Sequence, residues 1–289
     1  MSIQYEEMRV PSSDGIHTLA GRVYRPEGRV RGLFHVVHGM TEHIARYDGF
    51  ARALNEQGIV VAGHDHLGHG KSLPEGGTPV YFGQGSTWNT VVDDIYILHQ
   101  RLKQRYPDVP LCIMGHSMGS FLTRTYLIRY PGTVKAAVIM GTGWQPQAAI
   151  TGGLALANAI AAVSGENATS ELVTELAFGS YNKLFAPNRT KVDWLSADES
   201  NVDDYIADPL CGVDATVGLF RQMLHGIRFN QRQSHLRQMD REMPVLFVAG
   251  DKDPVGSCGK GVRQTYDAFR AAGMRDCTLK LYPGLRHEI

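Results

Sequence analysis

The sequence predicts an α/β protein with a mostly parallel sheet, and two observations support this prediction. Strand-like apolar runs alternate with helical segments along most of the chain, a pattern typical of a parallel sheet covered by helices. One junction between such segments reads Gly115-His116-Ser117-Met118-Gly119. This matches the G-x-S-x-G turn, in which a sharp strand-to-helix bend projects a serine hydroxyl clear of the sheet.

The individual elements follow from apolar periodicity and from turn residues. Residues 5–10 and 18–24 flank a turn at residues 12–15 and predict an antiparallel hairpin. Residues 32–37 and 59–63 predict central strands, with a helix over 47–57 between them. Helical spacing of apolar residues predicts a helix over 88–106 and another after Ser117 that ends at Pro131. The remaining strands are expected over 109–114, 134–140, 243–249 and 278–282, with a helix that ends near Gly273.

The alternation stops between Gly143 and about Val213. We interpret residues 144–213 as a helical cap, or lid, inserted after the sixth strand, and residues 1–143 with 214–289 as the core. An apolar helical patch over 154–163 is interpreted as a lid helix that faces the active site. The alternative, a helix buried against the sheet, stays open.

Composition and charge narrow the class of protein. The 289 residues include 29 Lys+Arg and 29 Asp+Glu, with no basic run, so no nucleic-acid partner is expected. The N-terminus does not look like a signal peptide, and no apolar stretch is judged to reach the roughly 18 residues that span a bilayer. The four cysteines show no metal-ligand spacing. These features favour a reduced, cytoplasmic protein.

A serine nucleophile needs a histidine base, which an acid must orient. The chain order Ser, acid, His is met by Ser117, an aspartate in the loop after residues 243–249, and His287. That loop offers two candidates. Asp253 lies further out and is the expected acid, while Asp251 is the alternative, which could instead cap the tight turn after Gly250.

The oxyanion of an acyl-transfer intermediate needs two N–H donors. We expect them at Met118, directly after the serine, and at Met40, where Gly39 lets the backbone turn; a plain turn is the alternative for this loop. His116 is expected to pack near these donors rather than act as a second base. His64, His66 and His69 cluster in the sequence, but no carboxylate or cysteine completes a convincing ligand set, so no metal is expected.

Taken together, these motifs resemble the monoglyceride lipase and lysophospholipase group of α/β-hydrolases, also described as serine aminopeptidase-like. The resemblance rests on residues 38–43, 65–72, 115–119, 250–253 and 286–288. It implies an eight-stranded sheet, a cap after the sixth strand, and hydrolysis of carboxylic esters without a cofactor. It also implies a Ser117, Asp253 and His287 triad with Met40 and Met118 as oxyanion donors. The group usually has a further helix after the His-Glu pair, whereas this sequence ends at Ile289, and a chain end there is expected to fray.

The leading hypothesis is a serine esterase that forms an acyl-enzyme on Ser117. Its expected substrates are monoacylglycerol-like, lysophospholipid-like or small acyl esters, including esters derived from membrane lipid. An amidase or peptidase of the same fold and a non-catalytic small-molecule-binding protein are the alternatives. The acyl length, the alcohol and the oligomeric state are left open. Substrate contacts are expected from Gly39, His116, Leu154, Leu156, Phe178 and Tyr181.

Overall fold

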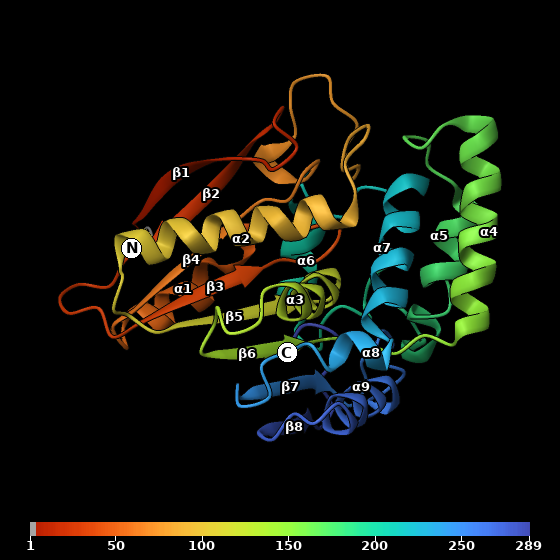
Figure 1. Cartoon of the computed structure of the whole chain (residues 1–289). Coiled ribbons are helices and arrows are strands. Elements are labelled where there is room, and N and C mark those ends of the chain that lie inside the picture. Colours follow the sequence, from red (N-terminus) through yellow and green to blue (C-terminus); the bar gives the residue numbers. More distant parts are fainter. Residues whose placement is uncertain (1–3) are drawn as a thin grey trace.

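The computed structural model describes residues 4–289, in which eight strands form one mixed sheet (Figure 1). The strand order is β1-β2-β4-β3-β5-β6-β7-β8, with β1 and β2 in an antiparallel hairpin, β2 antiparallel to β4, and all later neighbours parallel. The predicted fold class is therefore confirmed. The strands are β1 (Tyr5–Pro11), β2 (Thr18–Tyr24), β3 (Gly32–Val37), β4 (Ile59–His64), β5 (Leu111–His116), β6 (Ala136–Met140), β7 (Val245–Gly250) and β8 (Cys277–Tyr282).

Helices cover both faces of the sheet, because alternate strand residues point to opposite sides. Val36 and Val61 pack with α1 on one face, whereas Leu33 and Val60 belong to the larger core that includes α2 and α3 on the other. The helices of the core are α1 (Asp48–Asn55), α2 (Trp88–Arg105), α3 (Met118–Arg129), α8 (Gln233–Leu236) and α9 (Lys260–Ala271), with short 3₁₀ helices η1 (Ile44–Tyr47) and η2 (Gly70–Ser72).

The segment after β6 is helical and lies beside one end of the sheet (Figure 1). It contains α4 (Gln147–Ser164), α5 (Glu171–Phe178), η3 (Asn182–Phe185) and α6 (Glu199–Ala207), and α7 (Val217–Asn230) then returns to the core. We keep the name cap for residues 144–213. Packing of α7 against both α3 and α4 joins the cap to the helix that follows Ser117.

The length and composition of α4 contradict one expectation from the sequence. By these two criteria α4 is long and apolar enough to cross a membrane, although the sequence was expected to contain no such stretch. The full length of this apolar stretch is hard to recognise in the sequence, because alanines and glycines separate its few large apolar side chains. Most of this helix is not buried inside the protein.

Several boundaries differ from prediction for identifiable reasons. The predicted helix over 47–57 begins as η1 and continues as α1. β5 starts at Leu111 because Pro110 has no N–H to pair, although its carbonyl accepts from Leu33 at 2.8 Å. β5 also extends to His116, which pairs with Met140. The strand therefore leads directly into the turn that carries the serine.

Candidate active site

Ser117 lies in a strained turn between β5 and α3. Its φ of 53° and ψ of −122° are unusual for a residue with a side chain, and its N–H donates to Met140 O at 3.1 Å. The flanking glycines make this turn possible. A Cβ at Gly115 would lie 2.2 Å from Gly119 O, and one at Gly119 would lie 2.0 Å from Val37 O. The strand-turn-helix geometry predicted from G-x-S-x-G is therefore confirmed.

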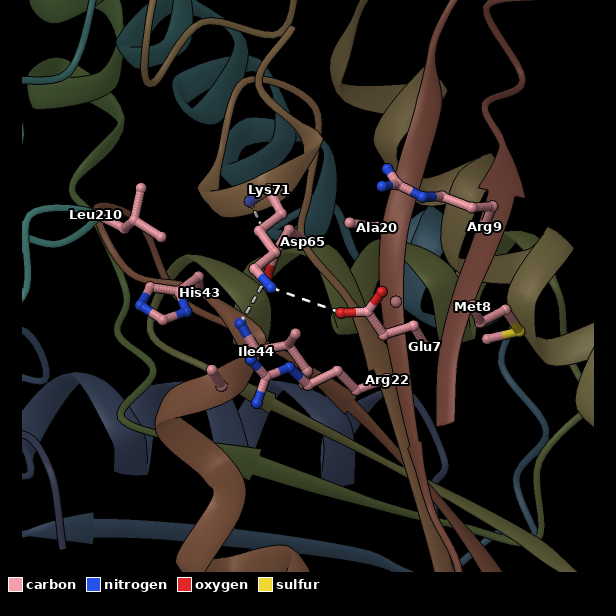
Figure 2. A pocket seen from close by; sticks show the side chains of 12 residues that line it. Glu7, Met8, Arg9, Ala20, Arg22, His43, Ile44, Asp65, Lys71 and Leu210 are labelled. Atoms are coloured by element: carbon pink, nitrogen blue, oxygen red, sulfur yellow. Dashed lines mark hydrogen bonds and ion pairs between the residues drawn. The ribbon is translucent and has the colours of Figure 1, made fainter. Parts of the chain in front are cut away.

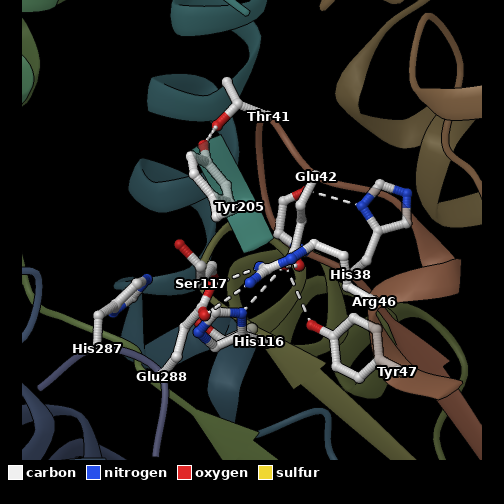
Figure 3. A network of polar contacts seen from close by, with 12 residues as sticks. His38, Thr41, Glu42, Arg46, Tyr47, His116, Ser117, Tyr205, His287 and Glu288 are labelled. Atoms are coloured by element: carbon white, nitrogen blue, oxygen red, sulfur yellow. Dashed lines mark hydrogen bonds and ion pairs between the residues drawn. The ribbon is translucent and has the colours of Figure 1, made fainter. Parts of the chain in front are cut away.

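His287 and Asp253 form a buried pair beside this turn. Nδ1 of His287 is 3.0 Å from Oδ1 of Asp253, and the two residues are 2% and 0% exposed. Oδ1 of Asp253 also accepts from the N–H of Val255 at 2.9 Å. Gly141 leaves room for the imidazole, since a Cβ there would lie 2.9 Å from Cε1 of His287. Ser117 and His287 line the same cavity, and Figure 3 shows both next to His116.

The other candidate acid, Asp251, has a different partner. Its Oδ1 accepts from the N–H of Gly284 at 2.9 Å, in the turn that follows β8. Its own N–H donates to Tyr282 O at 3.0 Å. Asp251 therefore ties two loops together, and the structure brings Asp253 rather than Asp251 to His287.

The loop after β3 lies against the serine. Met40 and Met118 both line the cavity, and Met118 is the first residue of α3, where helical N–H groups lack intrahelical partners. Gly39 is not among the residues that line the cavity, and its predicted contact with substrate stays a prediction. A Cβ at Gly39 would lie 3.1 Å from Cβ of Ser117 and 2.5 Å from Oε1 of Glu42. Gly39 is thus required for close packing behind the serine.

A buried carboxylate organises this loop. Oε1 of Glu42 accepts from the N–H of Gly39 at 2.5 Å, from Tyr47 Oη at 3.1 Å and lies 3.1 Å from Nδ1 of His116 (Figure 3). Oε2 accepts from Arg46 at 3.1 Å. The sequence reasoning missed Glu42, although it lies within one of the motifs quoted for the family resemblance.

Glu42 and His116 form a buried hydrogen-bonded pair. Burial alone would raise the pKa of Glu42, but its hydrogen bond to His116 and the charges of His116 and Arg46 lower it. Burial would likewise lower the pKa of His116, but the Glu42 carboxylate raises it above its ordinary value. His116 therefore packs near the serine as predicted, but as the polar partner of a carboxylate.

A cavity of about 800 Å³ opens above Ser117. Leu156, Phe178 and Tyr181 line it as predicted, and so does His116. Leu154 does not: it is 5% exposed and belongs to the core, while Val163 at the end of the predicted wall is 88% exposed. The predicted wall over 154–163 is thus only partly right.

Trp194 is a cap residue of this cavity that the sequence did not single out. Its ring centroid is 5.2 Å from that of Tyr181 and 5.3 Å from that of His287. It stacks on Phe178 with an interplanar angle of 9°. The aromatic cluster of the cap therefore touches the histidine as well as the cavity.

The histidines at the end of β4 are buried. His64, His66 and His69 have ring centroids 5.4 to 6.0 Å apart in sequence order, and burial lowers the pKa of each. Within residues 4–289, a different group has ligand atoms that could hold a metal: His43, Asp208 and Cys211, all within 4.8 Å of one another. Nε2 of His43 already bonds Oδ2 of Asp208 at 2.7 Å.

A smaller cavity of about 150 Å³ lies near His43, between the β1–β2 hairpin and the loop after β4 (Figure 2). Its central acid, Asp65, accepts from the N–H groups of Ile44 and Lys71, both at 2.8 Å. Lys71 Nζ lies 3.6 Å from Glu7. With its polar groups paired in this way, Asp65 joins the loops after β3 and β4.

The sheet order, the serine turn and the buried histidine-aspartate pair define an α/β-hydrolase of the esterase and lipase type. The family described as serine aminopeptidase, S33, matches residues 28–289, and the chain belongs to this family. The predicted family resemblance is confirmed.

Curated relatives and solved structures agree with this assignment. A monoacylglycerol lipase of Mycolicibacterium smegmatis is 31% identical, over 97% of this chain and 92% of that relative. The Homo sapiens monoglyceride lipase is 28% identical, over 100% of this chain and 86% of that relative. A thermostable carboxyl esterase from Bacillus coagulans, solved in complex with glycerol, superposes with a TM-score of 0.91 at 27% identity. That superposition covers 100% of this chain and 93% of the esterase.

Proposed function

We propose that this protein hydrolyses monoacylglycerol-like, lysophospholipid-like or small acyl esters through an acyl-enzyme on Ser117. The observation that carries the proposal is the position of Ser117. It stands on a strained turn at the floor of a cavity of about 800 Å³, and the buried Asp253–His287 pair borders the same cavity.

Each group has a defined part in this reaction. His287 accepts the proton of Ser117 as the hydroxyl attacks the ester carbonyl, while Asp253 at Nδ1 holds the imidazole in the required tautomer. The N–H groups of Met40 and Met118 stabilise the oxyanion. His287 then protonates the leaving alcohol, and it later activates the water that releases the acid. The scheme uses no cofactor.

The apolar side chains of the cap are evidence that the group bound above Ser117 is an acyl chain. Leu156 and Phe178 present apolar surface to the cavity, as do several neighbours on α4, α5 and α7. The names of two relatives, monoacylglycerol lipase and monoglyceride lipase, support the same class of substrate. Burial of an acyl chain against such a wall is favourable by about 0.8 kcal/mol per methylene at most.

The first test is the nucleophile. Replacing Ser117 with Ala should reduce turnover of p-nitrophenyl esters by roughly 10⁴-fold or more, since only binding and oxyanion stabilisation remain. A fluorophosphonate probe should label the wild type at Ser117 and leave this variant unlabelled. Ser234→Ala, at an exposed serine on α8, is the matched control and should keep wild-type activity.

A substrate panel separates the proposal from its alternatives. It contains p-nitrophenyl esters from acetate to palmitate and a peptide p-nitroanilide. Ester turnover without anilide turnover supports the esterase, and faster anilide turnover would identify a peptidase instead. Probe labelling at another residue, or a fully active Ser117→Ala variant, would overturn the assignment of the nucleophile.

A further inference from the structure

The segment that carries His287 is bound along the cap. The N–H of His287 donates to Trp194 O at 3.4 Å, and the N–H of Glu288 donates to Leu195 O at 2.6 Å. Nη1 of Arg286 donates to the carbonyls of Asp193 and Ser196, the latter at 3.0 Å. Residues 286–288 therefore run beside residues 193–196. Much of the support for the histidine comes from the cap, which the sequence identified only as a cover for substrate.

A polar junction fixes the end of this segment to both the core and the cap. Arg46 donates from Nη1 and Nη2 to the two carboxylate oxygens of Glu288, at 2.5 and 2.9 Å. Nδ2 of Asn201, on α6, donates to the same carboxylate at 2.5 Å. Nη2 of Arg46 also reaches Oδ1 of Asn201 at 3.3 Å. We call Arg46, Asn201 and Glu288 the cap junction (Figure 3 shows Arg46 and Glu288).

The cap junction continues into the loop behind the serine. Arg46 donates to Glu42 at 3.1 Å, and Glu42 in turn accepts the N–H of Gly39. Burial alone would lower the pKa of Arg46, but its hydrogen bonds and the charges of Glu288 and Glu42 raise it, so the guanidinium stays charged. One cation thus contacts the cap, the segment with His287 and the loop with Met40.

We propose that Arg46, Asn201 and Glu288 are positioning residues. Through these residues the cap, packed against the core, holds the imidazole of His287 in position to accept the proton of Ser117. This inference rests on the proposed function and adds regulation of the same site. The ability of His287 to act as the base then depends on the position of the cap. Displacement of the cap would then slow hydrolysis of every ester, including those too small to touch the apolar wall.

The geometry favours a role in orientation. A paired Arg–carboxylate fork fixes both the direction and the distance of the group it holds. The two side chains of this pair are 13% and 14% exposed, so loss of one partner also lowers stability. A shift of about 1 Å at a reacting group can reduce the rate by about 100-fold. Loss of the junction should therefore reduce kcat of the molecules that remain folded.

The test compares Asn201→Ala and Glu288→Gln on two substrates, p-nitrophenyl acetate and a long-chain p-nitrophenyl ester. We expect kcat to fall by about 10-fold or more on both substrates, with little change in KM for acetate, because the base is needed for each. Arg46→Lys should be intermediate, since lysine keeps the charge but cannot form the fork.

A matched control lies on the same helix. Asp203 forms an exposed ion pair with Arg189 at 2.6 Å, and Asp203→Asn removes it without touching residues 286–288. This variant should keep the wild-type kcat on both substrates. Amide hydrogen exchange at residues 287 and 288 should become faster in Asn201→Ala and remain unchanged in Asp203→Asn.

The outcomes separate the two proposals. A wild type that is neither labelled at Ser117 nor active on esters overturns the proposed function, whatever the variants do. An active wild type with variants that keep kcat on acetate overturns the cap junction alone. Loss restricted to the long-chain ester would mean that the junction only shapes the cavity. Urea unfolding of each variant identifies losses of folded protein, and fluorophosphonate labelling rates then report on the folded fraction.

Discussion

The two aspartates after β7 show how roles are decided by the orientation of single residues. Asp251 and Asp253 stand two positions apart on one loop, yet one accepts from Gly284 and the other meets His287. Residue type and chain order cannot separate them, since each follows the same strand. The path of the loop alone decides this: it points the carboxylate of Asp253 into the interior, where it is fully buried, and leaves that of Asp251 beside the turn that contains Gly284.

Replacing each aspartate should give opposite phenotypes. Asp253→Asn should lower kcat by up to about 10⁴-fold, because the imidazole loses the carboxylate that selects its tautomer. Asp251→Ala should leave kcat near the wild-type value and lower the free energy of unfolding by about 1 kcal/mol, through loss of the hydrogen bond to Gly284. Steady-state kinetics and urea unfolding on both variants check this. If Asp251→Ala is the inactive variant, the assignment of the acid is wrong.

At the scale of an element, α4 shows the limit of periodicity. Its sequence is apolar at nearly every position, so a helix could be predicted but not the direction in which each side chain points. Leu154 is buried in the core, whereas Leu156 and Ala157 line the cavity and Val163 lies in solvent. Both interpretations of this patch are therefore partly right: one side packs inward and another borders the cavity.

Leu156→Asp should remove the preference for longer acyl chains and spare turnover of p-nitrophenyl acetate. In the wild type, kcat/KM should rise with chain length by at most about 0.8 kcal/mol per buried methylene, until the cavity is filled. Val163→Asp, on the same helix at a position 88% exposed, is the matched control and should keep the wild-type profile. A Leu156→Asp variant with an unchanged profile would show that this side chain does not border the acyl chain.

At the scale of the whole molecule, the sequence predicts what local patterns encode. Strand and helix periods and the G-x-S-x-G turn predict the sheet and the position of Ser117. The contact of Glu42 with His116 and that of Arg46 with Glu288 are not predicted, because the partners lie 74 and 242 positions apart in the chain. From a charged residue within a motif, the sequence predicts that a partner exists, but the identity of that partner depends on the fold.

The fold also determines the protonation state of five buried histidines. His35, His38, His64, His66 and His69 are each at most 2% exposed, and burial lowers the pKa of every one, to about 4 for His64 and His69. Both ring nitrogens of His35 and of His64 lack a hydrogen-bond partner within residues 4–289. These imidazoles are therefore held neutral in the folded protein.

Acid should consequently destabilise the fold. Below the ordinary histidine pKa of 6.5, and down to about 4, the unfolded chain binds protons that the folded chain excludes, so stability is present above pH 6.5 and is lost as the pH falls. The pKa values of His116, Asp65 and Asp94 are raised and have the opposite sign, but these three groups stand against the five histidines and His99, whose pKa is also lowered by burial. Urea unfolding between pH 8 and pH 5 should show this decline.

His35→Phe isolates one member of this group. Phenylalanine fills a similar volume without a titrating nitrogen, so the variant should lose up to about 1.4 kcal/mol per pH unit from the slope of unfolding free energy below pH 6.5. His35 packs 6.3 Å from His64, centroid to centroid, and burial together with the charge of His64 lowers the pKa of His35. The wild type should therefore lose stability faster than the variant as the pH falls. Parallel curves for the two proteins, or a wild type equally stable at pH 7 and pH 5, would contradict the view that these buried imidazoles set the acid limit of the fold.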